Sequence, residues 1–295
     1  MKQILNEIRN SVEYKLGNRY KVSHKEQQKN NGVIRQGIVI TNIDNNTISP
    51  MIYVDEYVKH IRCGAMTASY VADSIISLYN FSRKNHIQSV RLMLENKQAV
   101  LGNVVYRLIN TKMNFSKLSI IPHKNFLDLS VEYRLVFTSP EGEHMSTTIN
   151  HELCEKLGIT EEELDKSARC NTCAGGFEKK SIAEIAEEIM GISMPCKDSM
   201  SMLVYTKKDH MYGASVMLYP QEFRDFAKKV HDDLFIFPSS IHEVIAVPAS
   251  DISDVSKYAL QSMVREINIS EVADDEVLSE NVYHYNIETG EITII

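Results

Sequence analysis

"FIFPSSIHEVIAVP", residues 235–248, places two apolar segments on either side of a short polar stretch. Pro238 has no backbone N–H to give to a sheet, and two hydroxyl side chains follow it, as in many turns. The apolar segments are too short for typical helices and are rich in Val, Ile and Phe, which favour strands. The stretch therefore predicts two strands joined by a turn at residues 238–243.

The residues on both sides of this stretch continue the alternation of short elements. "MSMLVYT" and "YGASVMLY" predict two further strands, and "PQEFRDFAKKVHDD" predicts a helix with Pro220 in its first turn. "VYHYNIETGEITII" predicts a closing hairpin. "DISDVSKYALQSMVREIN" predicts an amphipathic helix, whose apolar stripe is Ile252, Val255, Ala259, Met263 and Ile267. Residues 200–295 are thus expected to form ββαββα followed by a hairpin.

The preceding residues predict helices at 2–16, 55–62 and 67–82, with Val71, Ile75 and Leu78 as the buried stripe of the third. The segment 126–139 alternates apolar and polar residues and predicts a half-buried strand. Two capping boxes, Thr160 with Glu163 and Ser181 with Glu184, predict helix starts. The expected fold class is α+β, with short and mostly antiparallel strands. We expect an N-terminal part at 1–170, a linker-like segment with one helix at 171–199 and a C-terminal part at 200–295, or one intertwined unit.

The composition excludes several classes of protein. Hydrophobic residues make up 43% of the 295 residues and charged residues 24%, which is typical of a globular chain. A net charge of −7 disfavours general nucleic-acid binding, which depends on neutralising phosphates. No apolar run reaches the roughly 18–20 residues that cross a bilayer. The polar start and the odd number of scattered cysteines indicate a cytoplasmic protein with reduced thiols.

The turn at 238–243 carries the candidate catalytic residues Ser239, Ser240, His242 and Glu243. A hydrolase would use one serine as the nucleophile and His242 as the base, with an acid from elsewhere in the fold. In an extended chain, however, Ser240 and His242 lie roughly 6–7 Å apart, which is too far for direct proton transfer. The structural alternative, which we favour, is that the serines satisfy turn amides while His242 ties the hairpin to a neighbouring carbonyl.

Two further sets of residues suggest binding. Cys170 and Cys173 form one C-x-x-C pair, whereas a structural zinc site usually needs a second pair of ligands, so ordinary thiols are the simpler interpretation. Tyr283 and Tyr285 alternate in the last hairpin and could contact a ligand, although sheet packing also explains them. Since the familiar phosphate-binding and calcium-binding loops do not occur, no cofactor is expected.

Several segments together, among them "NNGVIRQGIVI", "PHKNFLDLSVEYR", "GASVMLYP" and "FIFPSSIHEVIAVP", resemble a bacterial family of unknown function that is associated with mobile elements. The "PSSIHEV" segment is the most recognisable part of this resemblance. The resemblance implies a cytoplasmic protein with no known cofactor or reaction, and it supplies no catalytic residues.

The leading hypothesis is a non-enzymatic binding or regulatory protein whose partner is a protein or a small molecule. Its candidate surface is the 238–243 turn together with the last hairpin. A hydrolase using Ser239 or Ser240 with His242 is one alternative. A mobile-element antagonist of a host defence system, acting by protein binding, is another. The sequence leaves the ligand and the oligomeric state open.

Overall fold

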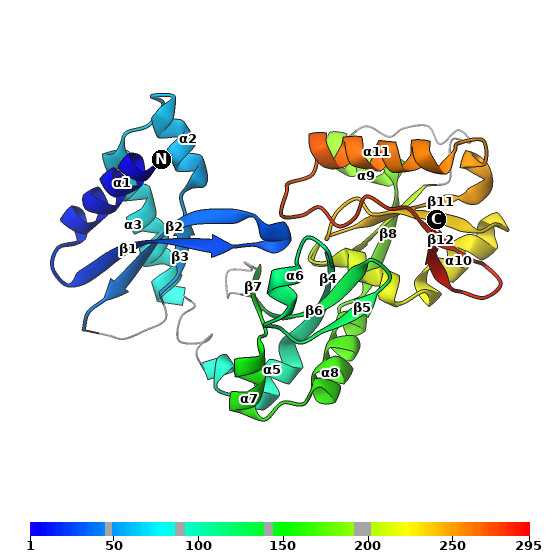
Figure 1. Cartoon of the computed structure of the whole chain (residues 1–295), viewed down its shortest axis with the longest axis horizontal. Coiled ribbons are helices and arrows are strands. Elements are labelled where there is room, and N and C mark those ends of the chain that lie inside the picture. Colours follow the sequence, from blue (N-terminus) through cyan, green and yellow to red (C-terminus); the bar gives the residue numbers. More distant parts are fainter. Residues whose placement is uncertain (45–48, 86–91, 139–143, 192–201) are drawn as a thin grey trace. The chain divides into compact units, whose positions relative to one another are not determined.

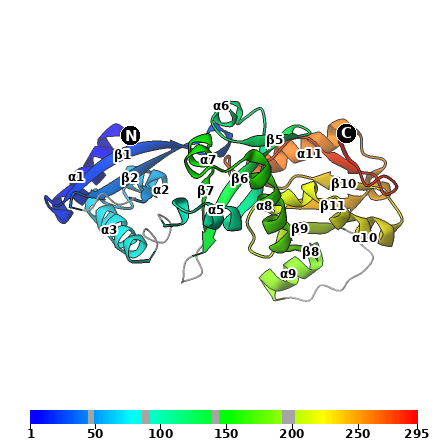
Figure 2. The same ribbon diagram turned by 90° about the horizontal axis from the view of Figure 1, so that it is seen from below.

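The computed structural model describes residues 1–44, 49–85, 92–138, 144–191 and 202–295. The chain forms two compact units, one of Met1–Ala99 with Phe137–Met145 and one of Val100–Val136 with Ser146–Ile295. Helices and strands mix in both units, and each pairing of known register is antiparallel, so the expected α+β class is confirmed (Figures 1 and 2). The described part of the segment 171–199 lies inside the larger unit.

The smaller unit places helices against a three-stranded sheet of order β1-β2-β3. Its elements are α1 (Lys2–Leu16), β1 (Tyr20–Gln28), β2 (Ile34–Asn42), β3 (Met51–Tyr53), α2 (Asp55–Arg62) and α3 (Ala68–Asn85). Helix α1 buries Leu5, Ile8 and Val12 and ends at Gly17, as its sequence predicts. In α3 the buried stripe passes through Val71 and Ile75, but Leu78 is exposed.

Strand β1 is not predicted by the sequence because almost all of its side chains are polar and only Val22 is buried. It pairs with β2 over its whole length, from Tyr20 opposite Asn42 to Gln28 opposite Ile34. The strand is therefore determined by its backbone pairing with the more apolar strand β2. Its own side chains show no alternation from which a strand could be predicted.

The larger unit contains a four-stranded sheet, in which β6 pairs with β4, β5 and β7, and a six-stranded sheet of order β13-β12-β10-β11-β9-β8. Its elements are α5 (Lys97–Asn103), β4 (Val104–Asn110), α6 (Phe115–Leu118), β5 (His123–Phe126), β6 (Leu129–Thr138), β7 (His144–Thr148), α7 (His151–Leu157), α8 (Glu161–Ala174), β8 (Phe177–Ser181), α9 (Ile182–Met190), β9 (Leu203–Lys207), η2 (Gly213–Leu218), α10 (Gln221–Val230), β10 (Leu234–Phe237), β11 (Val244–Pro248), η3 (Ala249–Ile252), α11 (Lys257–Ser270), β12 (Tyr283–Tyr285) and β13 (Ile292–Ile294). Helix α5 and the strands β6 and β7 also reach into the smaller unit.

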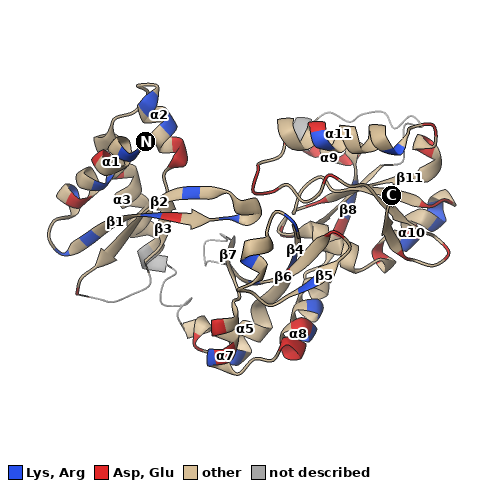
Figure 3. Ribbon diagram, viewed as in Figure 1, with Lys and Arg blue, Asp and Glu red and all other residues tan. Residues whose placement is uncertain are grey.

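Helix α8 packs against β4 of the four-stranded sheet. Its acidic first turn, red in Figure 3, begins at the predicted capping box of Thr160 and Glu163, which forms in both directions. The carboxylate of Asp165 accepts hydrogen bonds from the phenols of Tyr106 and Tyr133, at 2.8 and 3.0 Å. Burial would raise the pKa of Asp165, but hydrogen bonds from Lys124 and these phenols outweigh it and lower the pKa.

The six-stranded sheet has helices on both faces. The ring of Phe223 of α10 packs in a tilted arrangement against the rings of Tyr205 and Tyr285 on one face. Leu260 and Val264 of α11 form a cluster with Val282, against which Phe235 and Phe237 pack. Tyr285 is opposite Leu234 in the pairing of β12 with β10, so the two share a face of the sheet. Phe235 follows Leu234 and points to the other face, so the two clusters lie on opposite faces.

Two sequence predictions in this unit are wrong. Residues 213–218 form the 3-10 helix η2 instead of a strand; since all but Leu218 are buried, no alternation exists to distinguish the two structures. The stretch expected to be most linker-like forms the end of α8 and the edge strand β8. The predicted capping box of Ser181 and Glu184 does start α9.

Asp128, between β5 and β6, joins the two sheets of the larger unit. Its carboxylate accepts hydrogen bonds from the Ser279 hydroxyl at 2.7 Å, the Asn281 amide at 3.0 Å and the Tyr283 phenol at 2.8 Å. Hydrogen bonds to a charged acceptor are among the stronger ones in proteins. One carboxylate thus fixes a long C-terminal segment to a turn about 150 residues earlier in the chain.

Candidate functional site

The turn at 238–243 is closed by its own polar groups. The Ser239 hydroxyl donates to the Glu243 carboxylate at 3.1 Å, and the Ser240 hydroxyl accepts the His242 backbone N–H at 3.0 Å. The Ser240 N–H donates to the Glu243 carbonyl at 3.1 Å. In the part of the chain that the structure describes, neither serine hydroxyl bonds the imidazole. The turn therefore uses its hydroxyls for its own geometry, and it assembles no nucleophile–base pair.

The His242 imidazole faces the loop at 207–213. Its Nδ1 lies 3.0 Å from the His210 carbonyl oxygen and 3.3 Å from the Tyr212 backbone nitrogen. Its Nε2 lies 3.8 Å from a carboxylate oxygen of Glu276. The ring stacks on Tyr212 with centroids 5.7 Å apart. His242 therefore ties the turn to a second loop, the kind of contact that its spacing suggested.

That second loop is conformationally strained. His210 and Tyr212 both adopt left-handed backbone angles, with φ of 55° and 58°. Residues other than glycine pay of order 1–3 kcal/mol for such conformations, which persist only where the surroundings fix them and which concentrate at functional sites. The imidazole of His242 supplies part of that fixation for Tyr212.

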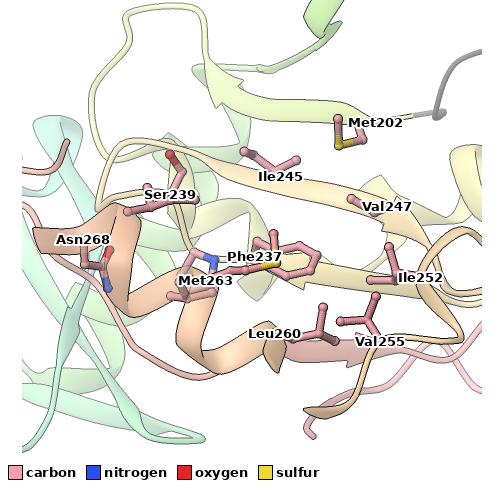
Figure 4. A pocket seen from close by; sticks show the side chains of 13 residues that line it. Met202, Phe237, Ser239, Ile245, Val247, Ile252, Val255, Leu260, Met263 and Asn268 are labelled. Atoms are coloured by element: carbon pink, nitrogen blue, oxygen red, sulfur yellow. The ribbon is translucent and has the colours of Figure 1, made fainter. Parts of the chain in front are cut away.

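On its other side the same turn borders an apolar cavity of about 240 Å³ between α11 and the sheet (Figure 4). Phe237, Ile245 and Val247 line the cavity from the sheet, and side chains of α11 line it from the opposite side. The lining residues are Met202, Phe237, Pro238, Ser239, Ile245, Val247, Ile252, Val255, Leu260, Met263, Val264, Ile267 and Asn268. This surface carries no charged side chain, so it suits a neutral apolar group.

The cavity opens to solvent along α11. Met263 is 52% exposed and Ile267 is 48% exposed, although both line the cavity. The sequence predicts Met263 and Ile267 in the apolar stripe of this helix. The structure buries a neighbouring stripe through Leu260 and Val264 and leaves Met263 and Ile267 at the open side. Two neighbouring apolar stripes give α11 a wider apolar face than the sheet covers. That excess width is the sequence signal from which the cavity could have been predicted.

The remaining candidate binding residues lie inside the fold. Tyr283 and Tyr285 of β12 are fully buried, and the Tyr283 phenol bonds Asp128. Burial and the Asp128 carboxylate raise the pKa of Tyr283 far above its usual range, which keeps the phenol protonated as a donor. Their positions give them packing and anchoring roles in the six-stranded sheet.

Cys170 and Cys173 stand in the last turn of α8 as free, exposed thiols. The two residues between them make the contacts. The Thr172 hydroxyl accepts the Tyr106 backbone N–H at 2.9 Å. The Asn171 amide donates to the Leu101 carbonyl of α5 and to the Val104 carbonyl at the start of β4. Within the described ranges, no group of three or more His, Cys, Asp or Glu side chains is placed to hold a metal ion. Cys196 lies outside the described residues.

None of the helices in the described ranges combines the length and the apolar character that a membrane crossing requires. Searches among curated proteins and among solved structures found no match to this chain. A family model does match, over residues 1–287, and its description is a family of unknown function. The match covers both structural units and includes the turn and the cavity, so the chain belongs to the DUF5688 family.

Proposed function

We propose that the protein is a non-enzymatic cytoplasmic binding protein that holds a small, neutral, apolar molecule in the cavity between α11 and the six-stranded sheet. The observation that carries this proposal is the cavity itself, which is lined by apolar side chains and open to solvent beside Met263 and Ile267. Protein interiors are normally close-packed, and unfilled apolar space costs stability. An apolar ligand would recover the lost contacts.

The size of the cavity suggests the size of the ligand. Apolar cavities of about 150 Å³ are known to accept benzene. A cavity of about 240 Å³ can therefore hold a molecule somewhat larger than benzene, such as a two-ring aromatic compound or a short alkyl chain. Ser239 and Asn268 also line the cavity, but the Ser239 hydroxyl donates to Glu243 and the Asn268 amide donates to the Ser279 carbonyl, so the ligand meets an apolar surface.

The test is a fluorescence titration with 1-aminonaphthalene, a neutral two-ring dye whose emission shifts to shorter wavelength in apolar surroundings. We expect saturable binding to the wild-type protein and a loss of about tenfold or more in affinity for Ile267→Glu, because a carboxylate at the mouth would have to be desolvated. Ile269→Glu is the matched control, since Ile269 is on the same helix, is 86% exposed and does not line the cavity.

Equal dye affinity in both variants would remove the cavity from consideration. Native mass spectrometry of gently purified protein then supplies an independent measurement. An added mass that is present in the wild type and in Ile269→Glu, but absent in Ile267→Glu, identifies a natural ligand of the cavity. A protein partner as the added mass would contradict the small-molecule proposal.

A further inference from the structure

Helix α8 covers one face of the four-stranded sheet. A buried group of charged side chains lies on the opposite face. It consists of Arg107, Lys117 and Arg134 around the carboxylate of Glu132, and we name it the cationic cluster. Arg107 on β4 is directly opposite Glu132 on β6, and Arg134 follows on the same face of β6. Lys117 comes from α6, and blue marks that helix in Figure 3. All four residues belong to the larger unit.

One carboxylate serves three cations. Arg107 Nε lies 2.8 Å from Glu132 Oε2, and Lys117 Nζ lies 2.8 Å from Oε1. Arg134 Nη1 is more distant, at 3.4 Å from Oε1. Burial would raise the pKa of Glu132, but the three cations outweigh it and hold that pKa well below its usual range. With Glu132 ionised, the cationic cluster carries a surplus of two positive charges.

Arg134 has the weakest neutralisation of the three. Its Nη2 donates to the Ser146 hydroxyl at 2.6 Å and its Nη1 donates to the Thr148 hydroxyl, both on β7. Its Nε is buried and makes no hydrogen bond among the described residues. These hydroxyls are neutral, so the only carboxylate that compensates the Arg134 charge among the described ion pairs is Glu132, which Arg107 and Lys117 share. A buried charge that is compensated only in part is costly.

The strained loop closes one side of the cationic cluster. The phenol oxygen of Tyr212 lies 2.6 Å from the Ser146 hydroxyl, and its ring centroid lies 5.4 Å from Arg107 and 5.9 Å from Arg134. The imidazole of His242 stacks on the same ring. Cation–π contacts of this kind keep guanidinium groups oriented. These contacts place the Tyr212 ring beside the surplus charge and help to fix Tyr212 in its left-handed backbone conformation.

We infer that the cationic cluster binds a dianionic phosphate group, either as free phosphate or as the phosphate of a small ester. Two surplus positive charges match the charge of about −2 that such a group carries near neutral pH, whereas a carboxylate would neutralise only one. The Lys117 side chain is 16% exposed and that of Arg134 is 12% exposed, so solvent reaches the cluster at these two residues. Arginine and lysine are also the residues that bind phosphate most often in proteins.

The experiment measures binding by calorimetry and by thermal shift, at constant ionic strength, with inorganic phosphate, glycerol phosphate, acetate and chloride. We expect at least one phosphate compound to bind, and to bind more tightly than acetate and chloride. Lys117→Gln and Arg134→Gln should each weaken that binding about tenfold or more, as expected when a charged hydrogen bond is lost. Lys112→Gln is the matched control, because Lys112 is exposed and carries the same charge.

The pattern of binding identifies the ligand. Tight binding of phosphate but not of the ester indicates the free anion, and the reverse indicates an ester. Circular dichroism confirms that each variant is folded, and Lys117→Gln, at the more exposed position, decides the matter if Arg134→Gln does not fold. The inference is overturned if neither phosphate compound binds more tightly than acetate or chloride, or if Lys117→Gln binds as the wild type does. Dye binding to the apolar cavity should be unchanged in both variants.

Discussion

Gly213 shows how tightly single atoms are fitted where the turn meets the strained loop. A Cβ at this position would lie 2.3 Å from the His242 carbonyl oxygen, 2.6 Å from the Thr206 Cα and 2.7 Å from the Lys207 backbone nitrogen. All three are backbone atoms, and backbone cannot move aside as a flexible side chain does. The sequence shows only a glycine in an apolar run. That the backbone of His242 and of residues 206–207 comes this close to Gly213 is known only from the fold.

Gly213→Ala should therefore destabilise the protein by about 1–3 kcal/mol or more, because the added methyl group forces β9 and the turn apart. Chemical denaturation measures this change. Gly102→Ala is the control: the space around Gly102 in α5 is open, and alanine there should be neutral or stabilising by up to about 1 kcal/mol. Equal stability of the two variants would contradict the close approach.

Lys117 gives the cationic cluster a dependence on pH. Burial lowers the pKa of Lys117 to about 8, and the attraction of Glu132 opposes this only in part. The free protein therefore loses one of its two surplus charges as the pH rises through about 8. Phosphate affinity should fall over that range, because deprotonated Lys117 no longer attracts the anion.

Calorimetry with whichever phosphate compound binds, between about pH 7.5 and pH 9.5, measures this decline. A phosphate ester with a second pKa of about 6 stays dianionic over this range. Inorganic phosphate loses its second proton nearer neutral pH and only gains negative charge as the pH rises, which would strengthen its binding and not weaken it. His123 of β5 is opposite Glu132 of β6, Tyr212 lies against Arg107 and Arg134, and His242 stacks on Tyr212. A substitution must therefore separate the effects of these groups from that of Lys117. Lys117→Arg keeps the positive charge at high pH and should flatten the decline. A decline that is equally steep in Lys117→Arg would assign the dependence to another group.

At the level of elements, the end of α8 joins the four-stranded sheet through Thr172. Thr172→Val removes the acceptor for the buried Tyr106 N–H and should cost about 1–3 kcal/mol of stability. Cys173→Ser, one residue further and exposed, should change the stability by less than about 0.5 kcal/mol. Urea denaturation distinguishes these values. A large loss in Cys173→Ser would instead indicate a role for the thiol pair.

Elements with a strong local signal were predictable from the sequence. The helix at 2–16, both capping boxes and the strand β6 carry their pattern within a few residues. Strand β1 and helix η2 depend on neighbours far away in the chain, so their own residues show no usable period. The register of α11 was misjudged because its apolar face is wider than one stripe.

The candidate sites were predictable only in part. The turn at 238–243 could be located, and it borders both the cavity and the strained loop. The cationic cluster could not be assembled, because its members come from β4, α6 and β6. A signal was nevertheless present: Arg107 interrupts the apolar run "VVYRLIN", and a charge inside a buried strand requires a partner. The sequence does not say which partner.

At the level of the whole molecule, the larger unit should be separable from the smaller one. Residues 100–295 contain all of the larger unit, including both of its sheets. We expect this fragment to fold, to melt cooperatively and to keep dye and phosphate binding. Residues 146–295 lack β4, β5 and β6 and should not fold. Circular dichroism and thermal melting test both fragments, and an unfolded 100–295 fragment would show that the units depend on each other.

The anchoring of Asp128 has a consequence for how the chain is made on the ribosome. Its three partners lie between Ser279 and Tyr283, so this carboxylate is translated about 150 residues before the groups that bond it. Strand β12, which pairs with β10, appears equally late. Until β12 is translated, the six-stranded sheet of the nascent chain is incomplete and its apolar surface is exposed. Nascent chains in such a state tend to aggregate. A premature stop codon before residue 279 would leave the chain permanently in that state.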